Sequence, residues 1–273
     1  MRLRAGALLV AVLVAGLTGC GDDEGDDEGA DGPVGGSPST AAAPPISERC
    51  ESGIPNDALV TTAGLGGGGL SLLGAEFDVP EGVDASGTVM VLLHQTGNLG
   101  LCGWGRFATE AANAGVRSLA VDLCGYGGSE CADGEQAPPD QQVDVAAAHA
   151  REVMGAERVV LVGASMGGSR TVMAVAAGAD VDGWADLSGP STWDGTTLAD
   201  LAPDVAARDL PGLVAHAPDD TPSEYAAAQA LAAATGAEFL DGDSGHGYEL
   251  LTITMGGLRP DGEELLAFVE SVG

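Results

Sequence analysis

Apolar residues along the chain follow two patterns, short continuous runs and longer stretches in which they recur at helical spacing. The run 88–93, Thr-Val-Met-Val-Leu-Leu, is typical of a strand buried on both faces. The other predicted strands are 58–63, 70–79, 116–121, 158–162, 181–187, 212–215 and 237–240. The predicted helices are 104–114, 141–154, 166–177, 223–234 and 263–269. Because strands alternate with helices, we expect an α/β fold with a mostly parallel central sheet and helices on both faces.

The N-terminus has the pattern of a targeting segment rather than of a folded element. Two arginines precede the apolar stretch 5–16, which is too short to span the ~30 Å hydrocarbon core of a membrane comfortably. The sequence Leu-Thr-Gly-Cys at 17–20 resembles the bacterial lipoprotein signal, which implies cleavage after residues 1–19 and lipidation of Cys20. We therefore expect an exported protein, anchored by acyl chains to the outer face of the bacterial cell membrane. Ordinary signal cleavage beside an incidental Cys20 is the alternative.

The residues that follow Cys20 predict a tether. The segment 20–47 begins with two Gly-Asp-Asp-Glu repeats after the cysteine and continues with Gly, Ser, Pro and Ala. It has no apolar periodicity and its charges repel one another, so we expect a disordered linker. The acidic run lacks the ligand spacing of a calcium loop. The remaining residues, 48–273, are long enough for one folded domain.

The charge of the chain excludes one class of partner. The formal net charge is −31, and the sequence contains no lysine. Phosphate neutralisation needs Lys and Arg patches, so nucleic acid is not an expected partner. Aromatic residues make up only 4% of the chain, so a core built from Val, Leu and Ala is expected.

The cysteines beyond Cys20 indicate disulfides, as expected for an exported protein. Four cysteines allow three pairings. We favour Cys124 with Cys131, which closes a short loop, and Cys50 with Cys102. Their spacing matches no zinc pattern and histidine is scarce, so neither a metal nor another cofactor is expected.

One motif carries the candidate chemistry. The apolar strand 158–162 leads directly into Gly-Ala-Ser-Met-Gly-Gly at 163–168, which contains Gly-x-Ser-x-Gly, and a helix follows. This strand–turn–helix context predicts a sharp turn that presents Ser165 at a helix N-terminus, where free N–H groups favour developing negative charge. Ser165 is therefore the candidate nucleophile. A structural corner with an idle serine is the alternative.

With this motif the chain resembles the α/β-hydrolase family over nearly all of residues 58–270. The sequence Leu-Leu-His-Gln-Thr-Gly at 92–97 looks like the family's oxyanion loop, although Gln95 stands where Gly is usual. The segment 121–129 looks like the family's Asp-x-x-Gly-x-Gly-x-Ser stretch. The resemblance implies an oxyanion hole formed by the backbone N–H groups of Thr96 and Met166, with Gln95 on the same loop.

The resemblance also implies the partners of the nucleophile. His246 lies in Asp-Ser-Gly-His-Gly after the last predicted strand, where the family's catalytic histidine belongs. The acid is expected after the strand 212–215, where Asp219 and Asp220 are adjacent and we favour Asp220. Asp186 is a remote third choice. The other histidines are expected to be structural: His94, His149 and His216.

These expectations describe a compact serine esterase that resembles dienelactone hydrolases. About two dozen residues separate 187 from 212, which leaves no room for a large cap domain. A small-molecule ester is the expected substrate, and the lipid anchor is the only expected contact with the membrane. A peptidase or other acyl hydrolase with the same triad is the first alternative. A binding module without turnover is the second.

Overall fold

A mixed sheet forms the centre of the computed structural model, which describes residues 45–50, 53–131, 137–253 and 256–273. Within these residues nine strands form one sheet. They are β1 (Val60–Gly67), β2 (Leu70–Phe77), β3 (Thr88–Leu93), β4 (Arg117–Val121), β5 (Glu130–Cys131), β6 (Arg158–Ala164), β7 (Gly183–Leu187), β10 (Gly212–His216) and β11 (Glu238–Asp241). The signal peptide, Cys20 and most of the tether lie outside the described residues and stay predictions.

The strand order is β1-β2-β4-β3-β6-β7-β10-β11, with β5 paired to β2. The hairpin β1–β2 joins the sheet antiparallel to β4, whereas the strands from β4 to β11 are parallel to one another. A second, two-stranded sheet pairs β8 (Thr192–Trp193) with β9 (Thr196–Thr197). Because carboxyl ends of parallel strands meet at one edge of a sheet, loops distant in sequence come together there.

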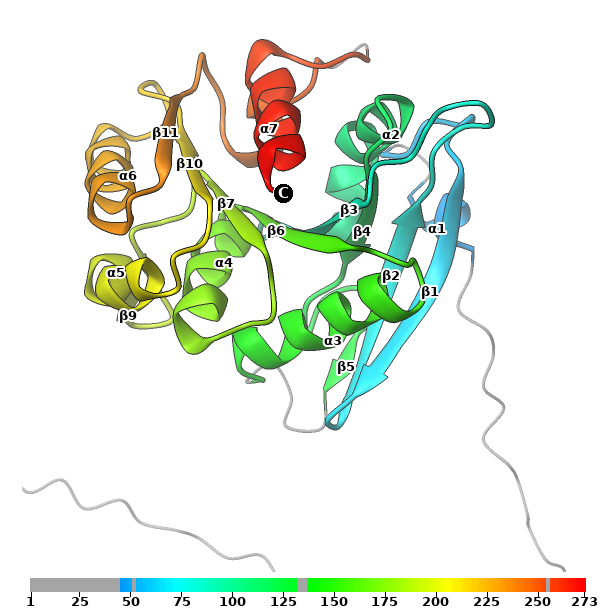
Figure 1. Ribbon diagram of the computed structural model, residues 1–273, viewed down its shortest axis with the longest axis horizontal. Coiled ribbons are helices and arrows are strands. Elements are labelled where there is room, and N and C mark those ends of the chain that lie inside the picture. The colour runs from blue at the N-terminus through cyan, green and yellow to red at the C-terminus, as the bar shows by residue number, and fades with distance from the viewer. Residues whose placement is uncertain (1–44, 51–52, 132–136, 254–255) are drawn as a thin grey trace, which may run out of the picture. The chain divides into compact units, whose positions relative to one another are not determined.

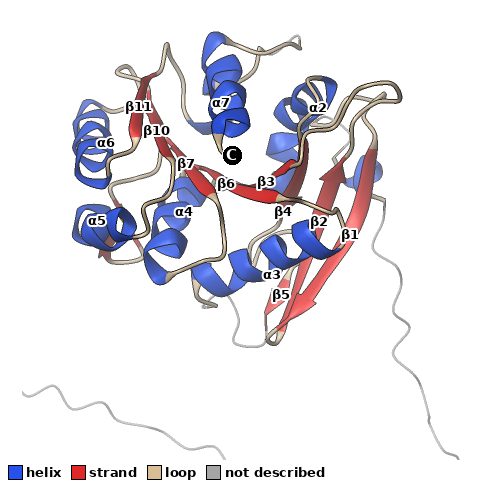
Figure 2. Cartoon of the chain, in the orientation of Figure 1, coloured by secondary structure: helices blue, strands red, loops and turns tan. Residues whose placement is uncertain are grey.

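Helices cover both faces of the sheet (Figures 1 and 2). On one face lie α2 (Gly105–Asn113) and α7 (Pro260–Ser271), and on the other α3 (Pro139–Glu152), α4 (Met166–Ala177), α5 (Leu198–Ala207) and α6 (Pro222–Thr235). Shorter helices are α1 (Ile46–Arg49), η1 (Gly100–Trp104) and η3 (Gly247–Leu250). Among the described residues, no helix has both the length and the apolar character needed to cross a bilayer.

The apolar run of β3 is explained by its position between two cores. Val89, Val91 and Leu93 pack in the core under α3 and α4. Met90 and Leu92 pack in the core under α2 and α7. Successive strand residues point to opposite faces, so a strand buried on both faces needs an apolar residue at every position. The sequence predicts the bounds of β3 and α4 as the structure has them.

Between β7 and β10 the sequence predicts no helix or strand. In the structure it contains the β8–β9 hairpin and α5. The hairpin strands have two residues each, too few for an alternating pattern. The helix α5 contains Pro203, a residue that normally interrupts helical hydrogen bonding. These elements fill the interval in which a cap would have to be inserted.

Two disulfides join the pairs that the sequence favours. Cys50, after α1, is bonded to Cys102 in η1, with a Cα–Cα distance of 5.3 Å. Cys124 is bonded to Cys131 in β5, with a Cα–Cα distance of 5.7 Å. The first disulfide fixes the N-terminal end of the described chain to the segment that follows the predicted oxyanion loop.

Candidate active site

The candidate nucleophile lies at the junction of β6 and α4. Ser165 has φ 51° and ψ −116°, a backbone conformation that is costly for a residue with a side chain. Its N–H donates a hydrogen bond of 2.8 Å to the carbonyl oxygen of Leu187 in β7. The residue is 7% exposed at the N-terminus of α4. The sheet therefore holds the strained turn, and the helix dipole favours negative charge beside it.

Glycines on both sides of Ser165 allow this turn. A Cβ atom at Gly163 would overlap the carbonyl oxygen of Gly167. A Cβ atom at Gly167 would overlap the carbonyl oxygen of Leu93 at the end of β3. Since both clashes are with backbone, no side-chain movement relieves them. The Gly-x-Ser-x-Gly pattern is thus a steric requirement of this strand–turn–helix corner.

His246 and Asp220 are joined by a short hydrogen bond. Nδ1 of His246 lies 2.6 Å from Oδ2 of Asp220. Asp220 follows β10, and His246 follows the neighbouring parallel strand β11. With the carboxylate as acceptor, Nδ1 carries the proton and Nε2 is left as a free acceptor. This is the tautomer that a general base for a serine hydroxyl requires.

The adjacent aspartate has a different partner. Oδ1 of Asp219 accepts a long hydrogen bond of 3.4 Å from the backbone N–H of Gly245. On the buried side, Nε2 of His216 lies 3.7 Å from Asp220 Oδ2. The structure therefore brings Asp220 to His246 and leaves Asp219 on the exposed side of the loop.

The histidine loop is held against the nucleophile turn. The N–H of Gly247 donates to Oγ of Ser188 at 3.1 Å. A Cβ atom at Gly247 would lie 3.3 Å from Cβ of Ala164, the residue before the nucleophile, and would overlap Oε1 of Gln95. Glycine at this position thus allows close approach of the two loops. In the part of the chain that the structure describes, Ser165 and His246 are not hydrogen-bonded to each other.

The buried side chain of His94 anchors the predicted oxyanion loop. Its Nε2 accepts a hydrogen bond of 3.1 Å from the N–H of Leu123, so Nδ1 carries the proton. Nδ1 donates to the carbonyl oxygen of Gln95 at 2.8 Å. Burial lowers the pKa of His94, which keeps the imidazole neutral. His94 therefore ties the loop after β3 to the loop after β4.

A tyrosine that the sequence did not single out fixes the same loop. The backbone N–H of Gln95 donates to the hydroxyl of Tyr248 at 2.8 Å. Because this N–H already donates to Tyr248, it is not free to donate to an oxyanion. The role predicted for Gln95 in the oxyanion hole therefore does not include its backbone N–H. Among the described residues, none accepts a hydrogen bond from the N–H of Thr96 or of Met166. These two donors remain open at the edge of the sheet.

Two further predicted residues lie away from the His246 imidazole. Asp186 in β7 is fully buried and accepts a hydrogen bond of 2.8 Å from the N–H of Gly189. Burial raises its pKa to about 7. His149 in α3 lies with Nε2 2.6 Å from Oε1 of Glu76. Within the described part of the chain, no cluster of three or more His, Cys, Asp or Glu side chains could hold a metal.

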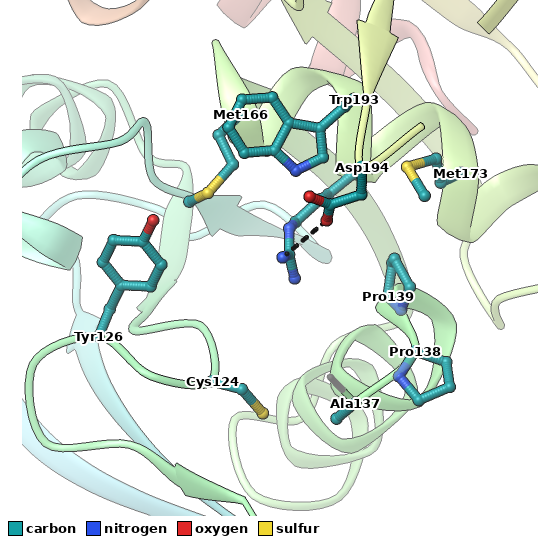
Figure 3. A pocket seen from close by; sticks show the side chains of 10 residues that line it. Cys124, Tyr126, Ala137, Pro138, Pro139, Met166, Met173, Trp193 and Asp194 are labelled. Carbon is teal, nitrogen blue, oxygen red and sulfur yellow. Dashed lines mark hydrogen bonds and ion pairs between the residues drawn. The ribbon is translucent and has the colours of Figure 1, made fainter. Parts of the chain in front are cut away.

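A pocket of about 520 Å³ lies beside the nucleophile turn (Figure 3). Met166, the residue after the nucleophile, forms part of its wall. The loop after β4, the start of α3, the outer face of α4 and the β8–β9 hairpin complete it. The pocket and the candidate nucleophile therefore have Met166 as a common neighbour.

Comparison with known proteins places the chain in a family. The model of the alpha/beta hydrolase family matches residues 90–265, more than half of the chain. The chain therefore belongs to the alpha/beta hydrolase family. No curated protein sequence matches it.

Solved structures share the fold at low identity. The esterase Est1E of Butyrivibrio proteoclasticus with ferulic acid bound has a TM-score of 0.56 and 15% identity, over 76% of this chain and 96% of that one. An esterase of Pyrococcus furiosus has a TM-score of 0.58 and 12% identity, over 83% of this chain and 93% of that one. A serine hydrolase without a lid from Xanthomonas campestris has a TM-score of 0.54 and 17% identity, over 80% of this chain and 94% of that one. The predicted α/β-hydrolase fold without a large cap is confirmed.

Proposed function

We propose that this chain is a serine hydrolase that cleaves carboxylic esters, with Ser165 as nucleophile, His246 as base and Asp220 as the acid that orients the base. The observation that carries the proposal is the 2.6 Å hydrogen bond from His246 to Asp220 at the sheet edge where Ser165 occupies its strained turn. Family membership supports hydrolysis as the class of reaction. The triad is recognised by its geometry and roles.

The chemistry follows from these positions. Ser165 Oγ forms a bond to the ester carbonyl carbon while its proton moves to Nε2 of His246. The carbonyl oxygen takes the negative charge and accepts hydrogen bonds from the open N–H groups of Thr96 and Met166. Collapse of the intermediate breaks the bond to the alcohol, which takes the proton from Nε2. Water then repeats the sequence on the acyl-enzyme and releases the acid.

The full-length protein tests this proposal with 4-nitrophenyl butyrate as substrate. We expect hydrolysis that is lost in Ser165→Ala, and labelling of Ser165 by a fluorophosphonate probe. Ser223 is an exposed serine at the start of α6. Ser223→Ala is the matched control, and it should keep both the hydrolysis of the ester and the labelling of Ser165.

Two outcomes favour the alternatives. A folded wild type that releases no nitrophenol but cleaves peptides in a Ser165-dependent way is a peptidase. A folded protein that shows neither turnover nor labelling of Ser165 is a binding module on the same fold.

We also propose that the protein is exported and lipidated at Cys20. The apolar segment 5–16 followed by Leu-Thr-Gly-Cys supports this, and the two disulfides are those of an oxidising compartment. Expression of wild type and Cys20→Ser in a bacterial host, followed by fractionation, tests it. We expect the wild type in the membrane fraction and the variant released from it. Equal partition of the two contradicts lipidation.

A further inference from the structure

The pocket beside the nucleophile turn contains a buried positive charge. Met166, Arg170 and Met173 recur at intervals of four and three along α4, so they share the helix face that lines the pocket. The Arg170 side chain is only 9% exposed. With a rise of ~1.5 Å per residue, Arg170 lies roughly two turns at most from the nucleophile. A guanidinium is thus placed in the wall of a cavity that is also lined by Met166, the residue after Ser165.

The hydrogen-bonding capacity of this guanidinium is largely unused. Its Nη2 lies 3.4 Å from Oδ2 of Asp194, the ion pair drawn as a dashed line in Figure 3. Among the described residues, its buried Nε has no partner. Arg208, by contrast, donates to the carbonyl oxygens of Val175 and Ala179 at 3.0 and 2.9 Å. A guanidinium has five N–H donors, so Arg170 keeps most of them available.

The contact with Asp194 does not account for burying this charge. The Asp194 side chain is 61% exposed, and the residue has a positive φ of 48° in the β8–β9 turn. A long contact to an exposed carboxylate contributes little to stability. Desolvating a charge without full pairing costs free energy, and such costs are concentrated at functional sites.

Other donors face the same space. In Figure 3 the indole nitrogen of Trp193 faces the Asp194 carboxylate, and the Tyr126 hydroxyl points toward the side chain of Met166. The indole Nε1 of Trp193 is buried, and no described residue accepts its hydrogen bond. The remaining wall is apolar, with Met166, Met173 and Pro138. The pocket therefore combines a cation and N–H donors at one end with apolar contacts along its side.

We infer that this pocket is a subsite for a carboxylate group of the substrate, which makes esters with a free carboxylate at a distance from the scissile bond the preferred substrates. The inference rests on the proposed esterase function and names its substrate class. The planar fork of the Arg170 guanidinium matches the two oxygens of a carboxylate. Asp194 at the rim disfavours a dianion such as phosphate. The apolar wall packs the chain that links the carboxylate to the ester.

Matched ester pairs test the subsite in the full-length protein. For a charge on the acyl side, mono(4-nitrophenyl) adipate is compared with 4-nitrophenyl hexanoate, which differs by the terminal carboxylate. For a charge on the alcohol side, 3-carboxyphenyl butyrate is compared with phenyl butyrate. Rates of Ser165→Ala are subtracted as background. We expect a higher kcat/KM for the charged ester in at least one pair.

Arg170→Gln should remove that preference. Loss of hydrogen bonds to a charged group predicts a decrease of about tenfold to hundredfold in kcat/KM for the charged ester, mainly through KM. The neutral ester should change by no more than about threefold, since Arg170 does not touch its scissile bond. Arg170→Lys should restore part of the preference. Arg151→Gln, which removes an equal charge from the Asp180 and Asp182 pairs, is the control and should have no effect on it.

The outcomes separate the subsite from the esterase reaction. If the wild type hydrolyses neutral esters but shows no Arg170-dependent preference in either pair, the subsite is wrong and the esterase stands. If nothing is hydrolysed, the tryptophan fluorescence of Ser165→Ala is titrated with adipate and with neutral hexanamide. Saturable binding of adipate that Arg170→Gln abolishes supports the subsite without the reaction. Absence of that binding overturns it.

Discussion

Oδ2 of Asp220 lies 2.6 Å from Nδ1 of His246 and 3.7 Å from Nε2 of His216, so one carboxylate faces two imidazoles. His216 is 1% exposed and also lies with Nδ1 3.1 Å from the carbonyl oxygen of Ala217. It closes the buried side of the site and limits the positions that the Asp220 carboxylate can adopt. Asp220 is thereby held in line with the His246 imidazole.

This arrangement predicts different effects at two adjacent aspartates. Asp220→Asn should lower kcat toward esters by about 10⁴-fold, because an amide permits the wrong imidazole tautomer. Asp219→Asn is the matched control and should change kcat less than about threefold, because Asp219 bonds only the loop backbone. Steady-state kinetics on 4-nitrophenyl butyrate measure both. Equal losses in the two variants contradict the assignment of Asp220.

Tyr248 should support both the fold and the predicted oxyanion loop. Tyr248→Phe leaves the N–H of Gln95 without its acceptor, which lowers the free energy of unfolding by about 1–3 kcal/mol. The loop that carries Thr96 loses an anchor, so kcat should decrease as well. Urea denaturation and ester kinetics measure the two effects.

Tyr225→Phe is the control for the tyrosine prediction. The Tyr225 hydroxyl donates to Asp241 at 2.8 Å in an exposed contact, so its removal should change stability by less than about 0.5 kcal/mol. If the two tyrosine variants are equally stable, the hydrogen bond to Gln95 does not hold the loop.

Asp186 should make the stability of the protein depend on pH. Burial raises its pKa from 3.8 to about 7, so the folded chain retains a proton that the unfolded chain releases. Stability from this group is present below pH 4 and is lost as the pH rises to 7. Relative to Asp186→Asn, the wild type should lose up to about 3 kcal/mol between about pH 5 and pH 8. Denaturant titrations of both proteins measure it, and a constant difference contradicts it.

The two disulfides should differ in their contribution to stability. Cys50 and Cys102 are 52 residues apart, whereas Cys124 and Cys131 are 7 apart. By loop-closure entropy, replacing the first pair with alanine should cost about 4 kcal/mol and the second about 2 kcal/mol. Thermal unfolding of the two double variants measures the order. A larger loss at the short loop contradicts it.

The sequence predicted most reliably the features that depend on residues close together in the chain. The turn around Ser165 lies within one continuous strand–turn–helix segment, and its glycines are required by clashes within that segment and with β3. The bounds of β3 follow from burial on both faces. Such features depend on neighbouring residues and on the periodicity of one element, and both can be read directly.

Contacts between distant segments could not be predicted in this way. Tyr248 meets Gln95 across 153 residues, and no local pattern marks the pair. Asp219 and Asp220 have the same side chain, so the sequence favoured Asp220 only through the family resemblance, and the loop conformation is what separates their partners. Trp193 forms part of the wall of the pocket that contains Arg170. It lies in the β8–β9 hairpin, whose strands are too short to show an alternating pattern of polar and apolar residues.

The disulfide between Cys50 and Cys102 also determines how tension would enter the molecule. The strands β1, β2 and β3 all lie between these two residues in the chain, inside the covalent loop. A pull on the backbone ahead of residue 45 reaches η1 through the sulfur bridge and bypasses the hydrogen bonds of the edge strand β1. While the bridge is oxidised, the covalent path of the tension omits the first three strands, and reduction would place β1 on that path at the edge of the sheet.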